Sequence, residues 1–181
     1  MAEAVAITSD AQAQPFILKR FDPASSAEVA SWVRGPAELK WVAPSCAPPI
    51  TSSMVRNWVK VNGRALILSR ADARVPIGYG ELNPLCDNPG ELWIGHVVLN
   101  PSLRGRGLGE HFTRLLLAHA FDEMAAERVS LVVFPENARA VDCYHRAGLR
   151  AVAEEFHRFG SGPKRRLVRM EAKPSARMAS R

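Results

Sequence analysis

The feature that most constrains this chain is a glycine-rich turn between a strand-like segment and an amphipathic helix. The segment Asn100–Glu110 reads NPSLRGRGLGE and carries Gly105, Gly107 and Gly109. Without side chains at these positions, backbone N–H groups can converge on an anion, and the positive end of the following helix dipole adds to this field. The turn therefore favours a phosphate- or pyrophosphate-holding loop, with a simple tight turn as the alternative interpretation.

Two nucleotide-binding fingerprints can be tested directly on this segment. A GxGxxG motif that starts at Gly105 needs glycine at position 110, where Glu110 stands. The phosphate-loop pattern GxxxxGK[ST] does not occur anywhere in the chain. The sequence therefore excludes a Rossmann dinucleotide fingerprint and a P-loop.

Hydrophobic patterning predicts a mixed α/β sheet of about seven strands with four or five helices. The expected strands are Pro15–Asp22, Arg64–Arg70, Val75–Leu85, Glu91–Asn100, Val129–Phe134, Leu149–Phe159 and Arg165–Ala172. The expected helices are Ser25–Arg34, Ala37–Val42, Ser52–Val61 with Thr51 as N-cap, a helix after Gly109 whose apolar stripe runs from Leu108 to Met124, and Ala138–Ala147 between Asn137 and Gly148. Three prolines in Pro44–Pro49 predict a loop of the kind that often shapes a substrate entrance.

The length of 181 residues predicts one domain, expected over residues 15–173, between a flexible N-terminus (1–14) and a basic flexible tail (174–181). No apolar run approaches the roughly 18–20 residues that cross a bilayer, and the N-terminus lacks a signal-peptide pattern, so we expect no membrane contact. The three cysteines are far apart and form no CxxC pair, which predicts neither a disulfide framework nor a zinc site. A reducing cytoplasm is the expected location.

The net charge of +6 is concentrated at the C-terminal end. Residues 158–181 contain eight Lys or Arg against one acidic residue, Glu171. A solvated surface is the favoured interpretation, with contact to nucleic acid or the ribosome as the alternative. If the last strand forms, its alternation turns Leu167 inward together with Arg165 and Arg169, and charge on that face then needs an explanation.

Two ordered motifs carry a resemblance to a known family. Arg104, Gly107 and Gly109 match the pattern [QR]xxGx[GA], and Val133–Leu149 contains an Asn, Ala, Tyr and Gly at matching positions, of which Asn137 and Tyr144 bear on function. These segments resemble the GNAT superfamily of acetyl-CoA-dependent N-acetyltransferases. The upstream segments, including Pro76–Asn83, look like its RimJ/RimL-type branch, which includes ribosomal-protein N-terminal acetylases.

The resemblance implies a role for several residues of this chain. The residues that it assigns to acetyl-CoA are Val97, Val98, Leu99, Arg104, Gly105, Arg106, Gly107, Leu108, Gly109, Asn137 and Tyr144. Backbone N–H groups of Val97–Leu99 would stabilise the oxyanion if a bulge or splay leaves them free. Tyr144 would donate a proton to the leaving thiolate, since an ordinary phenol is protonated at neutral pH. No metal is expected.

The general base is not assigned by the resemblance. Trp93 and Val132 stand where relatives often place a glutamate. The remaining candidates are Glu81, which is preferred, then His96 and Glu91, and a water chain without a dedicated base also stays open.

The resulting hypothesis is a monomeric or homodimeric N-acetyltransferase that acts on a small-molecule amine or a peptide N-terminus. A non-catalytic acyl-CoA sensor or scaffold, which the missing carboxylates at Trp93 and Val132 keep open, is the alternative.

Overall fold

A computed structural model describes residues 16–72, 75–88 and 90–174 of the chain. Its strands are β1 (Phe16–Arg20), β2 (Arg64–Arg70), β3 (Pro76–Pro84), β4 (Glu91–Leu99), β5 (Arg128–Val133), β6 (Arg150–Arg158) and β7 (Lys164–Ala172). Its α-helices are α1 (Ser26–Ser31), α2 (Gly35–Val42), α3 (Ser52–Arg56), α4 (Leu108–Ala118) and α5 (Ala138–Ala147). Short helical turns are η1 (Pro23–Ser25), η2 (Pro101–Leu103) and η3 (His119–Glu123). The mixed α/β fold predicted from the sequence is confirmed.

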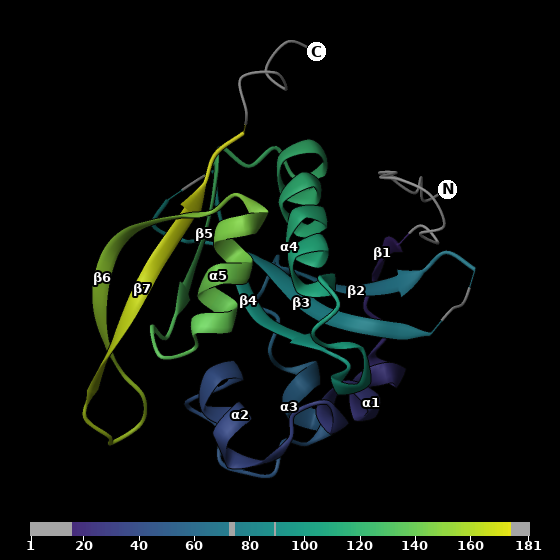
Figure 1. Cartoon of the computed structure of the whole chain (residues 1–181), viewed down its shortest axis with the longest axis horizontal. Coiled ribbons are helices and arrows are strands. Elements are labelled where there is room, and N and C mark those ends of the chain that lie inside the picture. Colours follow the sequence, from purple (N-terminus) through teal and green to yellow (C-terminus); the bar gives the residue numbers. More distant parts are fainter. Residues whose placement is uncertain (1–15, 73–74, 89, 175–181) are drawn as a thin grey trace.

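The seven strands form one sheet in the order β1-β2-β3-β4-β5-β7-β6. Neighbouring strands are antiparallel except for β4 and β5, which are parallel. In Figure 1, α4 and α5 lie in front of the sheet, whereas α1, α2 and α3 gather below it. The parallel pair is joined through α4, as expected for a strand-helix-strand crossover.

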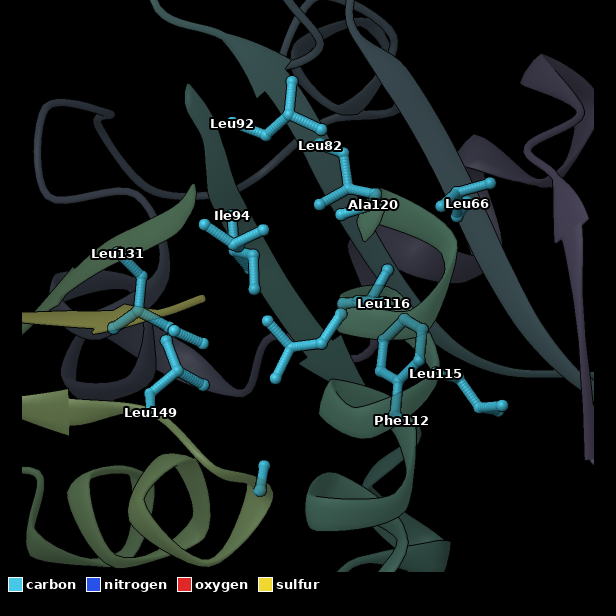
Figure 2. Close-up of a cluster of buried hydrophobic side chains, with 14 of the residues drawn as sticks. Leu66, Leu82, Leu92, Ile94, Phe112, Leu115, Leu116, Ala120, Leu131 and Leu149 are labelled. Atoms are coloured by element: carbon cyan, nitrogen blue, oxygen red, sulfur yellow. The ribbon is translucent and has the colours of Figure 1, made fainter. Parts of the chain in front are cut away.

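A first hydrophobic core lies between the sheet and α4. The helix buries Phe112 and Leu116 against strand residues that include Leu82 and Ile94, as Figure 2 shows. Close packing depends on Gly78 and Gly80 of β3, where an added Cβ would lie 3.2 Å from the Phe112 ring. Glycine on this face lets α4 lie close to the strand.

A second core lies on the opposite face of the sheet, under α1, α2 and α3. Trp32 and Trp58, which follow α1 and α3, pack with Tyr79 of β3 and Val98 of β4. Residues of one strand alternate between the two cores, because successive side chains point to opposite faces. Tyr79 of β3 therefore faces the helical region, whereas Gly78, Gly80 and Leu82 face α4.

The C-terminal end of α3 differs from that expected from the sequence. The predicted Ser52–Val61 helix ends at Arg56, and the backbone N–H of Lys60 donates instead to the Asn83 side chain at 2.9 Å. Thr51 is the N-cap as expected, accepting from the Met54 N–H at 3.2 Å. A tertiary hydrogen bond and the turn before β2 thus override local helix propensity.

The expected flexible N-terminus (1–14) and most of the expected tail (174–181) lie outside the described residues. Within the part of the chain that the structure describes, none of the helices is both long and apolar enough to span a bilayer.

Candidate active site

The glycine turn joins β4 to α4 and has an open backbone. Gly105 and Gly107 have φ angles of 79° and 76°, in the left-handed region that disfavours L side chains. A Cβ added at either position would meet no atom within 4 Å. Gly107 is the N-cap of α4, so the free N–H groups of the first helical turn begin here. The geometry is that of an anion-binding loop.

Gly109, the third glycine of the motif, is required by helix packing rather than by its backbone conformation. A Cβ at Gly109 would lie 3.0 Å from Sγ of Cys143 on α5. Glycine at this position therefore allows close packing of α4 on α5, and burial raises the pKa of the Cys143 thiol. Leu108, beside it, is half-buried and packs against the first core.

The Arg104 side chain is held by contacts within the protein. All three of its guanidinium nitrogens donate to protein oxygens: the Leu99 carbonyl at 3.1 Å, Glu38 at 2.6 Å and the Trp32 carbonyl at 2.7 Å. Burial would raise the pKa of Glu38, but hydrogen bonds from Arg104 and from the Arg34 N–H outweigh it and lower that pKa. Arg104 thus fastens the turn to α1 and α2, and its charge is neutralised by Glu38.

Arg106 is the second cation of the turn. It is exposed, and within the described residues its side chain forms no ion pair or hydrogen bond. Its guanidinium is therefore available to an anion at the turn.

β4, the strand before the glycine turn, separates from β5 on one side and forms a bulge against β3 on the other. The β4–β5 ladder runs only from Glu91–Arg128 to Trp93–Ser130, whereas β5 continues to Val133 along β7. On the other side of β4, Tyr79 faces Val98 and Glu81 faces Gly95, so His96 and Val97 oppose a single β3 residue. The structure thus has both a splay and a bulge, with the bulge starting before the expected Val97–Leu99 segment.

A buried carboxylate lies against this bulge. Glu81 is completely inaccessible to solvent and accepts hydrogen bonds from the Tyr79 hydroxyl at 2.8 Å and from the Asn83 amide at 3.0 Å. Burial and the Glu81 charge raise the pKa of Tyr79, which therefore stays a donor. A Cβ at Gly95 would come within 3.0 Å of the Glu81 carboxylate, so glycine there leaves room for it.

The third partner of Glu81 is His96. Its Nδ1 lies 3.0 Å from Oε1 of Glu81, and its ring stacks on Trp58 with 4.4 Å between ring centroids and an interplanar angle of 5°. His96 sits at a φ of 43°, and its side chain is 25% exposed. The bulge and the stacking together hold a solvent-accessible imidazole against a buried carboxylate.

Glu91, the third candidate for the base, lies away from Glu81 and His96. Glu91 is buried and contacts Ser130, Arg128 and Arg169 on the β5 side of the sheet. Of the three residues considered as a base, the structure brings together Glu81 and His96 and leaves Glu91 in a separate ion network.

The two residues singled out from α5 lie at its start and in its last turns. Asn137 caps the helix, its side-chain oxygen accepting from the Ala140 N–H at 3.4 Å. Tyr144 is half-buried against the first core, and in the described chain its hydroxyl makes no hydrogen bond to protein. Burial, with a smaller contribution from Cys143, raises the pKa of Tyr144, so the phenol keeps its proton at neutral pH.

The proline loop expected between the second and third helices lines a pocket of about 460 Å³. Pro48, Pro49 and Ile50 form one wall, and Ala30 of α1 and Leu39 of α2 contribute to the rest of the lining. None of the candidate catalytic residues lines this pocket. The described residues hold no group of three or more His, Cys, Asp or Glu suited to a metal ion.

Comparison with known proteins identifies the family. Residues 28–149, more than half of the chain, match the acetyltransferase (GNAT) family. The chain belongs to this family. The match extends from α1 to the start of β6 and so contains the glycine turn, the bulged strand and the Glu81–His96 pair.

Solved acetyltransferase structures share the fold. An acetyltransferase (GNAT family) from Bacillus anthracis is 14% identical, with a TM-score of 0.72 over 87% of this chain and 94% of that one. Spermidine N-acetyltransferase from Vibrio cholerae, in complex with CoA and spermine, is 16% identical, with a TM-score of 0.71 over 87% and 95%. The aminoglycoside acetyltransferase AAC(6')-Ib, in complex with coenzyme A and kanamycin, is 20% identical, with a TM-score of 0.68 over 91% and 98%. At these identities the likeness concerns the fold.

Residues around Glu81 that sequence reasoning missed are Tyr79, Asn83, Gly95 and Trp58. A signal was present in the segment GYGELN, because strand alternation places Tyr79, Glu81 and Asn83 on one face and two glycines on the other. Trp58 comes from a distant helical region and had no local signal.

Proposed function

We propose that the chain is an acetyl-CoA-dependent N-acetyltransferase that acts on a primary amine by direct attack. The observation that carries the proposal is the opening of β4 away from β5 beyond Trp93, with the glycine turn at its end and His96 at the bulge. A cosubstrate with a pyrophosphate and a narrow acyl arm fits this combination, since the turn offers free backbone donors and the splay leaves one edge of β4 unpaired.

Residues of the turn and of β4 would hold acetyl-CoA. The backbone of Gly105–Gly109 and the Arg106 guanidinium would hold the pyrophosphate, and the unpaired edge of β4 at Val97–Leu99 would hold the acyl arm. Asn137 contributes by fixing the start of α5. Arg104 acts as a positioning residue through its contacts to Trp32 and Glu38. Bound acetyl-CoA supplies an acetyl group activated as a thioester.

His96 is the proposed general base. Its Nδ1–H donates to the buried Glu81 carboxylate, which leaves the lone pair of Nε2 to accept the proton of the attacking amine. Glu81 has no exposed surface and cannot reach a substrate, so it acts as a positioning residue that fixes the tautomer and stabilises the imidazolium. The preferred base of the sequence analysis thus takes a supporting role.

The remaining two tasks fall to β4 and to α5. Free N–H groups on the splayed edge of β4 stabilise the oxyanion that forms when the amine attacks the thioester carbon. Tyr144, whose phenol keeps its proton at neutral pH, donates that proton to the thiolate as the C–S bond breaks.

The acceptor is a small-molecule amine or a peptide N-terminus, and the RimJ/RimL-like resemblance fits both without choosing between them. Reaction in the cytoplasm is supported by the three cysteines, all of which are free.

Calorimetric titration with acetyl-CoA, desulfo-CoA and CoA, followed by addition of pooled amines and N-terminal peptides, tests the proposal. Binding of all three cosubstrate forms, with amine-dependent thiol release from acetyl-CoA only, is expected. Binding without thiol release from any amine would favour the non-catalytic acyl-CoA sensor, and absence of binding would reduce the glycine motif to a turn.

A further inference from the structure

A group of aromatic side chains and one arginine lies at the carboxyl end of β5. Phe134 follows the last residue of β5 and contacts Trp41 of α2 and Phe159 of the β6–β7 turn, with ring centroids 5.3 Å and 5.7 Å apart. The Arg165 guanidinium lies over the Phe134 ring, 4.3 Å from its centroid. We call these four residues the Arg165 cluster.

The cluster lies beside the proposed acyl-transfer site. Because β4 and β5 run parallel and separate beyond Trp93, their carboxyl ends flank the opening between them. α2 contacts β4 and brings Trp41 onto Phe134, so it bridges the opening on the face that also carries Glu81. By strand register, the Arg165 cluster and Glu81, the partner of His96, lie on the same face of the sheet.

Arg165 is the unpaired cation of this face. Among the described residues it forms no ion pair and no side-chain hydrogen bond, although it is half-buried on β7. Arg169, on the same face of β7, is paired with Glu155 and Glu91. A guanidinium that lies over an aromatic ring and forms no ion pair keeps its donors available for a carboxylate or phosphate.

The carboxylates of this face are already satisfied. Glu81 has three donors, Glu91 contacts Arg128 and Arg169, and Glu155 contacts Arg169 and His157. Burial would raise the pKa of Glu155, but hydrogen bonds from His157 and Arg169 outweigh it and lower that pKa. Among these strand residues, the charge left without a partner at the opening is therefore that of Arg165.

Resting on the proposed function, we infer that the amine acceptor carries an anionic group, and that Arg165 receives it. The Arg165 guanidinium pairs with a carboxylate or phosphate of the acceptor while Trp41 and Phe159 enclose its apolar part. The anion can belong to a free amino acid or to an acidic side chain near a peptide N-terminus, since both offer the same chemistry to Arg165.

Steady-state thiol release with matched acceptors tests the inference. The pairs are free amino acids against their amides, and peptides with Asp against Asn at the second position. The wild-type protein should prefer the anionic member of at least one pair. The pair that shows this preference identifies whether the anion belongs to a free amino acid or to a peptide side chain. Arg165→Gln should raise KM for that acceptor by about 10- to 100-fold, the usual loss of a charge-assisted pair, with kcat and the KM of the neutral acceptor little changed.

Three further variants keep the test decisive. Arg166→Gln is the matched control, because Arg166 is exposed, pairs with Glu154 and points to the other face of β7. Arg165→Lys keeps the positive charge and should retain part of the preference for the anionic acceptor. This variant keeps the inference testable if Arg165→Gln fails to fold. Glu136→Gln removes the exposed carboxylate on the turn after Phe134, the residue that a cationic acceptor would use.

The contradicting results are distinct. Equal kcat/KM for the acid and its neutral partner, or an equal loss for both in Arg165→Gln, would overturn the inference and leave Arg165 a packing residue. A KM effect in Glu136→Gln rather than in Arg165→Gln would show a cationic acceptor. Acetyl-CoA binding without thiol release from any amine would instead overturn the proposed function, and this inference with it.

Discussion

At the scale of single residues, Glu81 links the fold to the proposed chemistry. A carboxylate without solvent contact is costly unless donors surround it, and here Tyr79, Asn83 and His96 provide them. The imidazole of His96 is the one member of this group with a substantial exposed surface, at 25% of its side chain. The buried charge of Glu81 therefore acts on the His96 imidazole, which a substrate can reach.

Glu81→Gln should lower kcat by roughly tenfold or more, because it removes the charge that stabilises the His96 imidazolium. It should also cost about 1–3 kcal/mol in free energy of unfolding, since one donor then faces the new amide NH₂. Glu91→Gln is the matched control, as a buried carboxylate that does not contact His96. Denaturant unfolding and steady-state kinetics compare the two, and an equal loss of kcat in both would remove Glu81 from the mechanism.

Tyr144→Phe should reduce kcat by roughly 10²-fold while the Kd for acetyl-CoA stays unchanged, since only the phenolic proton is lost. The half-buried ring continues to pack against the first core in the variant. Calorimetry for binding and thiol release for turnover separate the two quantities. Unchanged turnover would assign Tyr144 to packing alone.

At the scale of elements, the glycine turn joins a left-handed backbone to the start of α4. Gly107→Glu should abolish acetyl-CoA binding, because a carboxylate would occupy the position of the pyrophosphate. Gly107→Ala is its control for backbone strain of about 1–2 kcal/mol at the positive φ of 76°. Calorimetry should find weak or no binding in the first variant and retained binding in the second. Equal affinity of both for acetyl-CoA would contradict the anion-binding interpretation of the turn.

The Glu38–Arg104 ion pair connects this turn to α2, and its stabilising effect should depend on pH. The pKa of Glu38 is lowered by folding, so its contribution is present above the ordinary value of 4.5 and is lost as the pH falls through the lower folded value. Glu38→Gln removes the titration. Denaturant midpoints of the two proteins should therefore differ at neutral pH and converge in acid, whereas a constant difference would show that the carboxylate charge does not matter.

Most elements could be predicted from the sequence because their signals are local. The α5 helix has its N-cap and its C-terminal glycine in the sequence, and its predicted range, Ala138–Ala147, is confirmed. α3 could not be delimited, because the hydrogen bond from Lys60 to Asn83 joins positions 23 residues apart. The direction of the Arg104 side chain was equally hidden, since its partner Trp32 is 72 residues away.

At the scale of the whole molecule, the register between strands β3 and β4 brings the residues of the candidate active site together. Glu81 and His96 are both visible in the sequence, but their contact requires the register shift between Tyr79 and Glu81, which no periodicity reveals. The sequence alone therefore predicted Glu81 and His96 as alternative candidates for the base, whereas the fold places them in contact. The inward-facing charge foreseen at Arg165 and Arg169 likewise found its explanation only in three dimensions, where other strands and α2 supply Phe134, Trp41 and Glu155.

The most direct test of the account is amine-dependent thiol release by the wild-type protein and by His96→Gln, measured side by side at saturating acetyl-CoA. The account predicts release by the wild-type protein and a rate about 10²- to 10⁴-fold lower in the variant, with the calorimetric Kd for acetyl-CoA unchanged. Equal rates in the two proteins would contradict His96 as the base, and the absence of release by the wild-type protein with every amine would contradict the acetyltransferase itself.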